Sequence, residues 1–165
     1  MNEQAQASSR DDGVQLVTLA AYRNTEVLAQ LEIRVYTASS AYDDSPWTEA
    51  GFDEQRPEKL TKSLIAIDSA KQPIGFLIAS RRNPTQLHIH RLAVDPDYWR
   101  QGIARRLLSR FLTDAADSIP KQSVSVFCDP VNASALGLYQ AAGFHAVGSN
   151  ADGKIELRLW ALVNP

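Results

Sequence analysis

The sequence has little cysteine, because Cys128 is the single one among 165 residues. One thiol excludes an internal disulfide and a cysteine-rich metal site, and it is typical of a reducing compartment. No apolar run approaches the roughly 20 residues that a membrane span requires. The first residues also lack the apolar segment of a secretory signal. We therefore expect a cytoplasmic protein with no membrane association.

Long basic runs are absent as well. Lysine and arginine number 17 against 19 aspartates and glutamates, and the formal net charge is −2. This balance weighs against nucleic-acid binding, which favours clustered positive charge. The length fits one domain. Because the first residues are polar and aperiodic, we predict a disordered tail over residues 1–13 and a single domain over residues 14–165.

Hydrophobic periodicity predicts an alternation of strands and helices. Expected strands cover residues 14–19, 63–68, 74–82, 87–94 and 123–128, with a closing hairpin of 144–149 and 154–163. Expected helices begin near Asn24, within 45–58, at Ile103 (ending at Pro120), and at Asn132. The strand, helix and strand over residues 87–128 can form a parallel crossover. This order predicts an α/β fold with a mixed, mostly antiparallel sheet of about seven strands and helices on both faces.

The segment "DPDYWRQGIARRLL", residues 95–108, leads from a strand into a helix. A helix N-terminus presents unpaired N–H groups and binds anions, and Gly102 and Ala104 let a ligand approach the backbone. Arg100, Arg105 and Arg106 add charge that suits phosphate. The pattern is also compatible with an ordinary strand-to-helix turn. A P-loop and a dinucleotide fingerprint are excluded, because their additional glycines are missing.

Two segments together resemble a known family. "LAVDPDYWRQGIARRLL" is similar to the acetyl-CoA-binding motif of the GNAT superfamily of N-acetyltransferases. "NASALGLYQAAGF" resembles the second segment of that family at Asn132, Ala135, Tyr139, Gly143 and Phe144. The resemblance covers residue 63 to the C-terminus. The sequence departs from the motif at Trp99, which stands where the family has Arg or Gln.

The resemblance implies that acetyl-CoA is the co-substrate and that no metal is needed. The pyrophosphate is expected on the N–H groups of residues 101–104, and pantetheine along residues 92–94. An N–H near Val94 would polarise the thioester carbonyl, and Asn132 would bond the pantetheine arm. The expected binding residues are Leu92, Ala93, Val94, Arg100, Gln101, Gly102, Ile103, Ala104, Arg105 (with Arg106 as the alternative arginine), Asn132, Ala135 and Tyr139.

Three residues are catalytic candidates. Tyr139 matches the family's general acid, which would protonate the leaving thiolate, although a core aromatic is the alternative interpretation. His88 stands where some members have a basic Glu, and His90 shares its strand face by the two-residue period. Either histidine is a candidate base, with His88 preferred, and packed strand histidines are the alternative. A covalent role for Cys128 is disfavoured, since a lone strand cysteine is usually a small buried hydrophobe.

The acceptor is left open between classes. "SPWTEAGF" and "AVDPDY" resemble ribosomal-protein N-terminal acetyltransferases, but Phe127 stands where those enzymes place a catalytic Glu. The aromatic and acidic residues around Trp47 favour a small cationic amine, unless they are simply a solvated surface. We expect a small-molecule amine acetyltransferase, monomeric or homodimeric. The alternatives are an N-terminal peptide acetyltransferase and a non-catalytic acyl-CoA-binding regulatory module.

Overall fold

A computed structural model describes residues 12–39, 45–118 and 123–160. The strands are β1 (Gln15–Thr18), β2 (Leu64–Ile67), β3 (Pro73–Asn83), β4 (Gln86–Val94), β5 (Ser123–Cys128), β6 (His145–Ser149) and β7 (Ile155–Leu159). The helices are α1 (Thr25–Ala38), α2 (Glu49–Asp53), α3 (Lys59–Lys62), the 3-10 helix η1 (Pro96–Tyr98), α4 (Ile103–Ser118) and α5 (Ala133–Ala141).

The seven strands form one sheet in the order β1-β2-β3-β4-β5-β7-β6. Only β4 and β5 pair in parallel among these strands, and every other neighbouring pair is antiparallel. The connection from β4 to β5 runs through α4, as the sequence predicts for residues 87–128. The predicted mixed, mostly antiparallel sheet is therefore confirmed.

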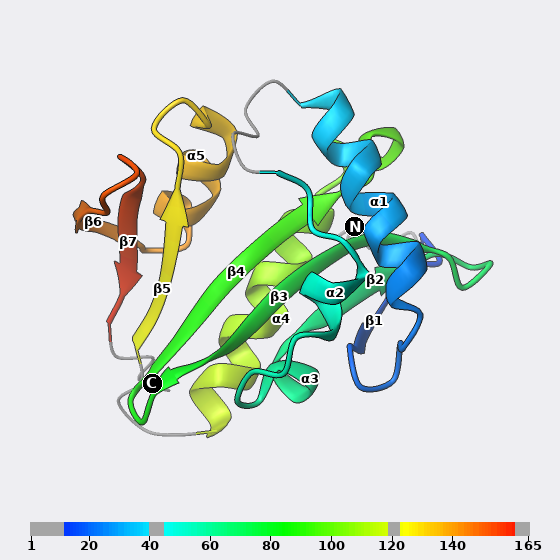
Figure 1. The fold of residues 1–165 in the computed structure, drawn as a ribbon, viewed down its shortest axis with the longest axis horizontal. Helices are drawn as coiled ribbons and strands as arrows, with labels where there is room; N and C mark the ends of the chain where they lie inside the picture. The colour runs from blue at the N-terminus through cyan, green and yellow to red at the C-terminus, as the bar shows by residue number, and fades with distance from the viewer. Residues whose placement is uncertain (1–11, 40–44, 119–122, 161–165) are drawn as a thin grey trace, which may run out of the picture.

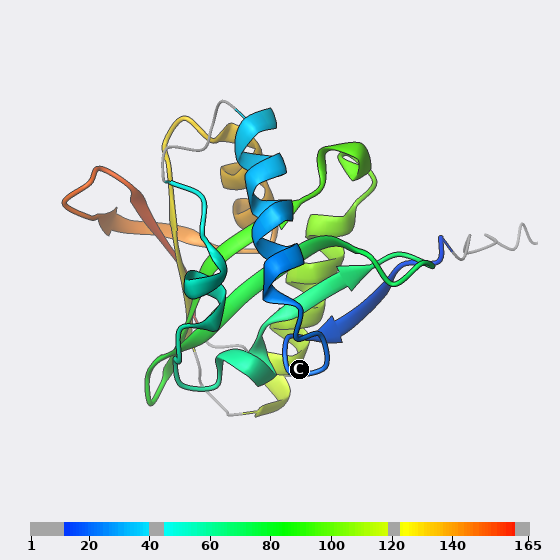
Figure 2. The same cartoon turned by 45° about the vertical axis from the view of Figure 1, so that its right-hand side comes forward.

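Helices cover both faces of the sheet (Figures 1 and 2). On one face, α1 packs over β2 and β3 around Leu28, Phe52 and Phe76. On the other face, α4 and α5 pack around Leu107, Phe111 and Tyr139. Because side chains of a strand alternate between faces, each central strand contributes to both cores.

The segment between α1 and β2 holds two helices, α2 and α3, where the sequence predicted a single short one. Tyr42, Asp43 and Asp44 of this segment lie outside the described residues, as do Pro120, residues 161–165 and residues 1–11 of the predicted tail. Asp12 is described, and its carboxylate pairs with Arg106 at 2.7 Å.

Lys59 connects α3 to the end of α2. Its side chain is buried, and its ammonium donates to the carbonyl oxygens of Gly51, Phe52 and Glu54. These carbonyls belong to the end of a helix, where backbone acceptors lack partners within the helix. Burial lowers the pKa of Lys59, with the nearby Arg56 charge adding to the effect. The lysine therefore serves as a covering donor for the α2 terminus.

Replacing Lys59 by Met retains the length of the side chain and removes all three hydrogen bonds. Because buried carbonyls would then lack donors, we expect a loss of about 2–3 kcal/mol in the free energy of unfolding. Urea denaturation would measure it. The matched control is Lys62→Met in the same helix, expected within about 0.5 kcal/mol of the original protein. Equal stability of the two variants would contradict the capping role.

Candidate functional site

The parallel strands β4 and β5 separate partway along their length. Their register runs from Gln86↔Ser123 to Ile89↔Val126 and ends there. Strand β4 continues to Val94, whereas Phe127 and Cys128 of β5 pair only with β7 among the described residues. A gap between the two strands opens beyond Ile89 (Figure 1). We call this gap the splay.

A β-bulge lies where the splay begins. Arg91 pairs with Ile78 and Ile89 pairs with Ala79, so His90 is an extra residue in β4. Such an insertion bends a strand and increases its twist. It also shifts the alternation of side chains, because Ile89 and Leu92 both pack in the core on the α4 face. The bulge thus turns the end of β4 away from β5.

The edge of β4 presents backbone groups to the splay. The N–H of Asp95 donates to the carbonyl of Ile74 on β3 at 2.8 Å. Since this direction alternates along an antiparallel strand, Leu92 and Val94 direct their N–H and C=O groups away from β3. The indole N–H of Trp99 donates to the Val94 carbonyl at 2.7 Å. The N–H of Val94 and both backbone groups of Leu92 therefore face the splay.

The turn before α4 has the geometry of an anion site. Arg100 and Gly102 have φ values of 61° and 79°, in the left-handed region. Left-handed residues in a turn make successive N–H groups converge, which favours anions, and the α4 N-terminus adds its dipole. A Cβ built on Gly102 meets no protein atom within 4 Å. The space beside Gly102 is therefore open. The side chain of Ile103 is buried, so this residue can contribute its backbone only.

The arginines near this turn have different partners. Arg106 donates to Asp12 at 2.7 Å and to the Val14 carbonyl at 3.0 Å, which holds it toward β1. Of the two arginines expected near the phosphate, Arg106 is thus engaged elsewhere. Arg105 is exposed and remains the candidate. Arg100 is exposed as well.

Contacts with other elements hold the turn in place. Arg34 of α1 pairs with Asp95 at 2.9 Å and with Asp97 at 3.1 Å. Asp95 is buried and also accepts from the N–H of Asp97, capping η1. The hydrogen bond from the Trp99 indole to Val94 links the turn to the end of β4 as well. The family motif has Arg or Gln at this position. Trp99 instead makes a hydrogen bond to the backbone of Val94.

Helix α5 is positioned as the sequence predicts. Asn132 caps it by accepting from the N–H of Ala135 at 3.0 Å, and Gly143 follows its end with a φ of 96°. Tyr139 is buried, and its ring lies 5.4 Å from that of Phe144. Tyr139 is therefore part of the core on the α4 face, as well as a candidate acid.

His88 and His90 contact each other on the α1 face, with ring centroids 4.9 Å apart. His88 Nδ1 and Ser125 Oγ share a hydrogen bond of 2.8 Å, and His90 Nε2 and Ser80 Oγ share one of 2.7 Å. Burial, with a contribution from the positive charge of Arg82, lowers the pKa of His88 to about 4. Burial and the neighbouring His88 lower the pKa of His90 to about 3. Both imidazoles are therefore neutral at physiological pH.

Aromatic rings extend from the histidines in both directions. The Trp47 ring lies 6.4 Å from His90, and the Phe127 ring lies 5.2 Å from His88. The guanidinium of Arg82 covers the Phe127 ring at 5.6 Å. We call Trp47, His90, His88 and Phe127 the aromatic row. Phe127 directly follows the last β4–β5 pair, so the aromatic row ends where the splay begins, which we call its mouth.

Two acidic residues of the segment between α1 and β2 form ion pairs. Glu54 pairs with Arg56, and Glu58 pairs with Arg81. Phe52 is buried in the core. Sequence patterns do not reveal the positive charges that act on the histidines, Arg82 above all. A second irregularity in the β3–β4 register, between Arg81 and Asn83, sets the direction of Arg82, and strand periodicity alone does not show it.

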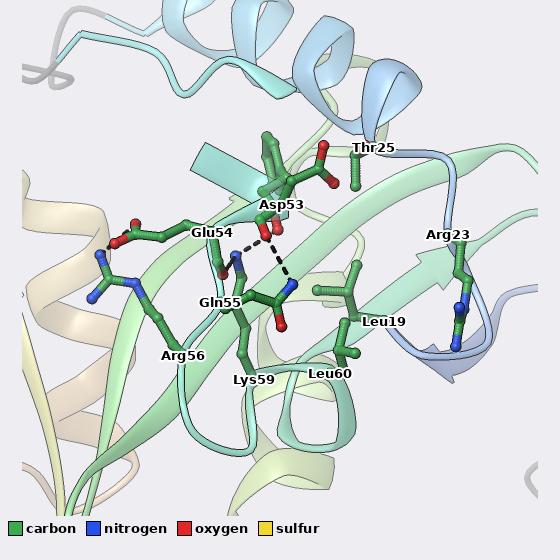
Figure 3. A pocket seen from close by; sticks show the side chains of 10 residues that line it. Leu19, Arg23, Thr25, Asp53, Glu54, Gln55, Arg56, Lys59 and Leu60 are labelled. Atoms are coloured by element: carbon green, nitrogen blue, oxygen red, sulfur yellow. Dashed lines mark hydrogen bonds and ion pairs between the residues drawn. The ribbon is translucent and has the colours of Figure 1, made fainter. Parts of the chain in front are cut away.

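A pocket of about 230 Å³ lies between the β1–α1 connection, α2 and α3 (Figure 3). Arg23 and Thr25 line one side and Asp53 and Glu54 the other, with Lys59 directed to backbone carbonyls. It shares no lining residue with the splay. Within the described ranges, no three His, Cys, Asp or Glu side chains are grouped to hold a metal ion. No described helix is long and apolar enough to cross a membrane.

Cys128 has the properties of a buried thiol. It is 5% exposed and donates to the Asp129 carbonyl at 3.6 Å. Burial, with the neighbouring Asp129 charge, raises its pKa to about 11. Since the thiolate is the nucleophile, this environment disfavours covalent chemistry at Cys128.

Comparisons with known proteins place this arrangement in context. A model of the Acetyltransferase (GNAT) family matches residues 25–144. The N-alpha-acetyltransferase RimI of Mycobacterium tuberculosis is 29% identical over 123 residues, 73% of this chain and 72% of that protein. The [ribosomal protein bS18]-alanine N-acetyltransferase of Escherichia coli K12 is 29% identical over 61% of this chain and 65% of that protein. An uncharacterized protein of Mycobacterium leprae is 28% identical, and the match spans only 32% of its length.

Solved structures share the fold. The ribosomal-protein-S18-alanine N-acetyltransferase from Escherichia coli superposes with a TM-score of 0.72 at 21% identity, covering 92% of this chain and 96% of that one. The PaiA N-acetyltransferase from Thermoplasma acidophilum, in complex with coenzyme A, gives 0.71 at 14% identity, with 89% and 98% coverage. The predicted fold class is confirmed by these similarities.

The low histidine pKa values predict a pH dependence of stability. An unfolded histidine titrates near 6.5, whereas folded His88 titrates near 4. The unfolded chain therefore binds protons first, and stability is lost as the pH falls from about 6.5 toward 4. His88→Asn, which keeps a polar group near Ser125, should flatten the curve by about 1–3 kcal/mol over this window.

Urea denaturation at several pH values would measure this difference. The matched control is His145→Asn, which removes an exposed histidine of β6. Parallel stability curves for His88→Asn and the original protein would show that His88 is not held neutral by the fold.

Proposed function

The chain belongs to the acetyltransferase (GNAT) family, and we propose that it transfers an acetyl group from acetyl-CoA to the primary amine of a small molecule. The proposal rests on the splay. It lies between the turn at Gly102, where an anion is proposed to bind, and the aromatic row at Phe127. An extended arm bearing amides and a pyrophosphate matches the groups along this path. A protein that only binds acyl-CoA would not require a general acid at the position of Tyr139.

The chain's own residues account for binding. The N–H groups of Gln101, Gly102, Ile103 and Ala104 would receive the pyrophosphate, with Arg100 and Arg105 supplying charge. The free N–H and C=O of Leu92 would pair with an amide of the pantetheine arm. Ala93 would contribute by position only, because its side chain is buried in the core on the α1 face. Asn132 would donate from its amide, because its oxygen is already engaged at Ala135.

The transfer is a direct displacement. The lone pair of a neutral amine forms the new C–N bond at the thioester carbonyl carbon, and the C–S bond breaks with its electron pair on sulfur. The Val94 N–H would stabilise the negative charge that develops on the carbonyl oxygen. The Tyr139 hydroxyl would give its proton to the departing thiolate.

His88 is the proposed acceptor of the amine's proton. Its Nδ1 is engaged with Ser125, so Nε2 is the nitrogen that would meet the amine or an intervening water. A pKa near 4 makes it a weak base. His88 would therefore act on an amine that is already neutral: as the C–N bond forms, the nitrogen becomes acidic and gives its extra proton to His88 Nε2, directly or through a water, and from there to solvent. His90, bonded to Ser80, would hold the ring of His88 in place.

The residue at the mouth of the splay, Phe127, favours a small-molecule amine as the acceptor. Phe127 occupies the position where the resemblance implies a catalytic Glu in the N-terminal acetyltransferases, and its ring contacts His88. A peptide N-terminus is the second candidate, favoured by the similarity to RimI and the bS18-alanine enzyme. Release of thiol from acetyl-CoA, measured with amines, amino acids, aminosugars and peptides, distinguishes the two. Saturable acetyl-CoA binding without turnover on any class would contradict both.

Replacing Tyr139 by Phe removes only the hydroxyl. If this hydroxyl protonates the thiolate, kcat should fall by about 100-fold while the affinity for acetyl-CoA changes little. The control is Tyr22→Phe, which alters a half-buried tyrosine that packs with the core on the α1 face. Unchanged turnover in Tyr139→Phe would leave Tyr139 as a core aromatic only.

Gly102→Glu places a side chain and a negative charge where the pyrophosphate is proposed. We expect loss of acetyl-CoA binding by at least about 100-fold, measured by isothermal titration calorimetry. Gly153→Glu is a matched control, because Gly153 also has a positive φ, 78°, and open space around its missing Cβ. Equal binding by the two variants would contradict the placement of the pyrophosphate.

A further inference from the structure

We propose that Arg82 and Arg158 form a subsite for an anionic group, such as a carboxylate, on the acceptor amine. We call these two residues the arginine pair. The inference rests on the proposed acetyltransferase function and specifies its acceptor as an amino carboxylate or a similar amino acid-like anion.

The arginine pair comes from opposite sides of the splay. Arg82 lies near the end of β3, and Arg158 lies on β7. Glu156 stands between them, 3.7 Å from Arg82 and 2.6 Å from Arg158. Because Glu156 pairs with Phe127 in the register of β5 and β7, the cluster lies directly beside the aromatic row.

The charge of this cluster is not balanced. Two guanidinium groups share one carboxylate, so the three side chains carry a net charge of +1. The other arginines of this face have acidic partners of their own. Arg56 pairs with Glu54, Arg81 with Glu58 and Arg91 with Glu32. The arginine pair differs from these arginines, because its two guanidinium groups have one carboxylate between them.

The cluster is partly open to solvent. The side chain of Arg82 is 45% exposed and that of Arg158 is 24% exposed, so neither is sealed in the core. Guanidinium groups match the planar geometry of a carboxylate and bind it through charge-assisted hydrogen bonds. A ligand anion at this point would restore the charge balance that Glu156 alone does not achieve.

The position relative to the candidate base supports a substrate role. The Arg82 guanidinium covers Phe127, and Phe127 contacts His88. A small acceptor with its anion on Arg82 would thus present its amine toward His88 and the splay. The positive charge of Arg82 also reaches His88, where it contributes to the lowered pKa. Arg82 and Arg158 are therefore specificity residues in this proposal.

The test compares acceptors that differ in one charge. Glycine, β-alanine and 4-aminobutyrate would be assayed beside their uncharged amides, with acetyl-CoA at saturation. The expected kcat/KM of at least one acid exceeds that of its amide by about tenfold or more. Arg82→Gln and Arg158→Gln should each lower this ratio by about tenfold, mainly through the KM of the acid, and leave the KM of acetyl-CoA unchanged.

Two further variants keep the result interpretable. Arg158→Lys retains the charge and should recover part of the preference, which a purely structural role would not do. Arg110→Gln removes an exposed arginine of α4 that pairs with Asp114, and it should keep the full preference. Thermal unfolding of each variant would show that the fold is intact.

The outcomes separate this inference from the proposed function. Acetylation of amides, plain amines or peptides as efficiently as the acids overturns the anionic subsite and leaves the acetyltransferase function standing. A preference for acids that survives in both glutamine variants also overturns it. Absence of turnover on every class of amine contradicts the proposed function and this inference with it.

Discussion

The bulge at His90 is the constraint on which the site depends. Strand β4 pairs with β5 only up to Ile89, and the extra residue turns the remaining strand away. Without this separation, the backbone groups of Leu92 and Val94 would be used in the sheet, because a central parallel strand bonds on both edges. The two histidines share the α1 face because side chains alternate along the strand up to the bulge, and they lie where the parallel pairing ends.

The turn before α4 is held in place by residues of other elements as well as by its own. Arg34 of α1 holds Asp95 and Asp97 from one side, and the Trp99 indole holds Val94 from the other. Left-handed residues such as Arg100 are unfavourable in isolation and persist where neighbouring contacts fix them. Helix α1 is therefore linked by two ion pairs to the turn that is proposed for the pyrophosphate.

The charges near the histidines depend on which side chains pair in the folded chain. Counting residues in the loop around Trp47 predicts an acidic surface, but Glu54 and Glu58 each pair with an arginine. Strands β3 and β7 then bring Arg82 and Arg158 to a single glutamate. Residues distant in sequence thus form a cluster with a net charge of +1.

The sequence by itself determined most of the order of elements, the glycine turn that opens α4 and the cap of α5, because local rules govern them. Gly102, Asn132 and Gly143 act through their own backbone and nearest neighbours. The tertiary structure alone decided that Arg106 faces Asp12, that Trp99 bonds Val94 and that Arg82 reaches Phe127. These contacts depend on a bulge, on strand register and on packing between distant segments, which sequence periodicity does not encode.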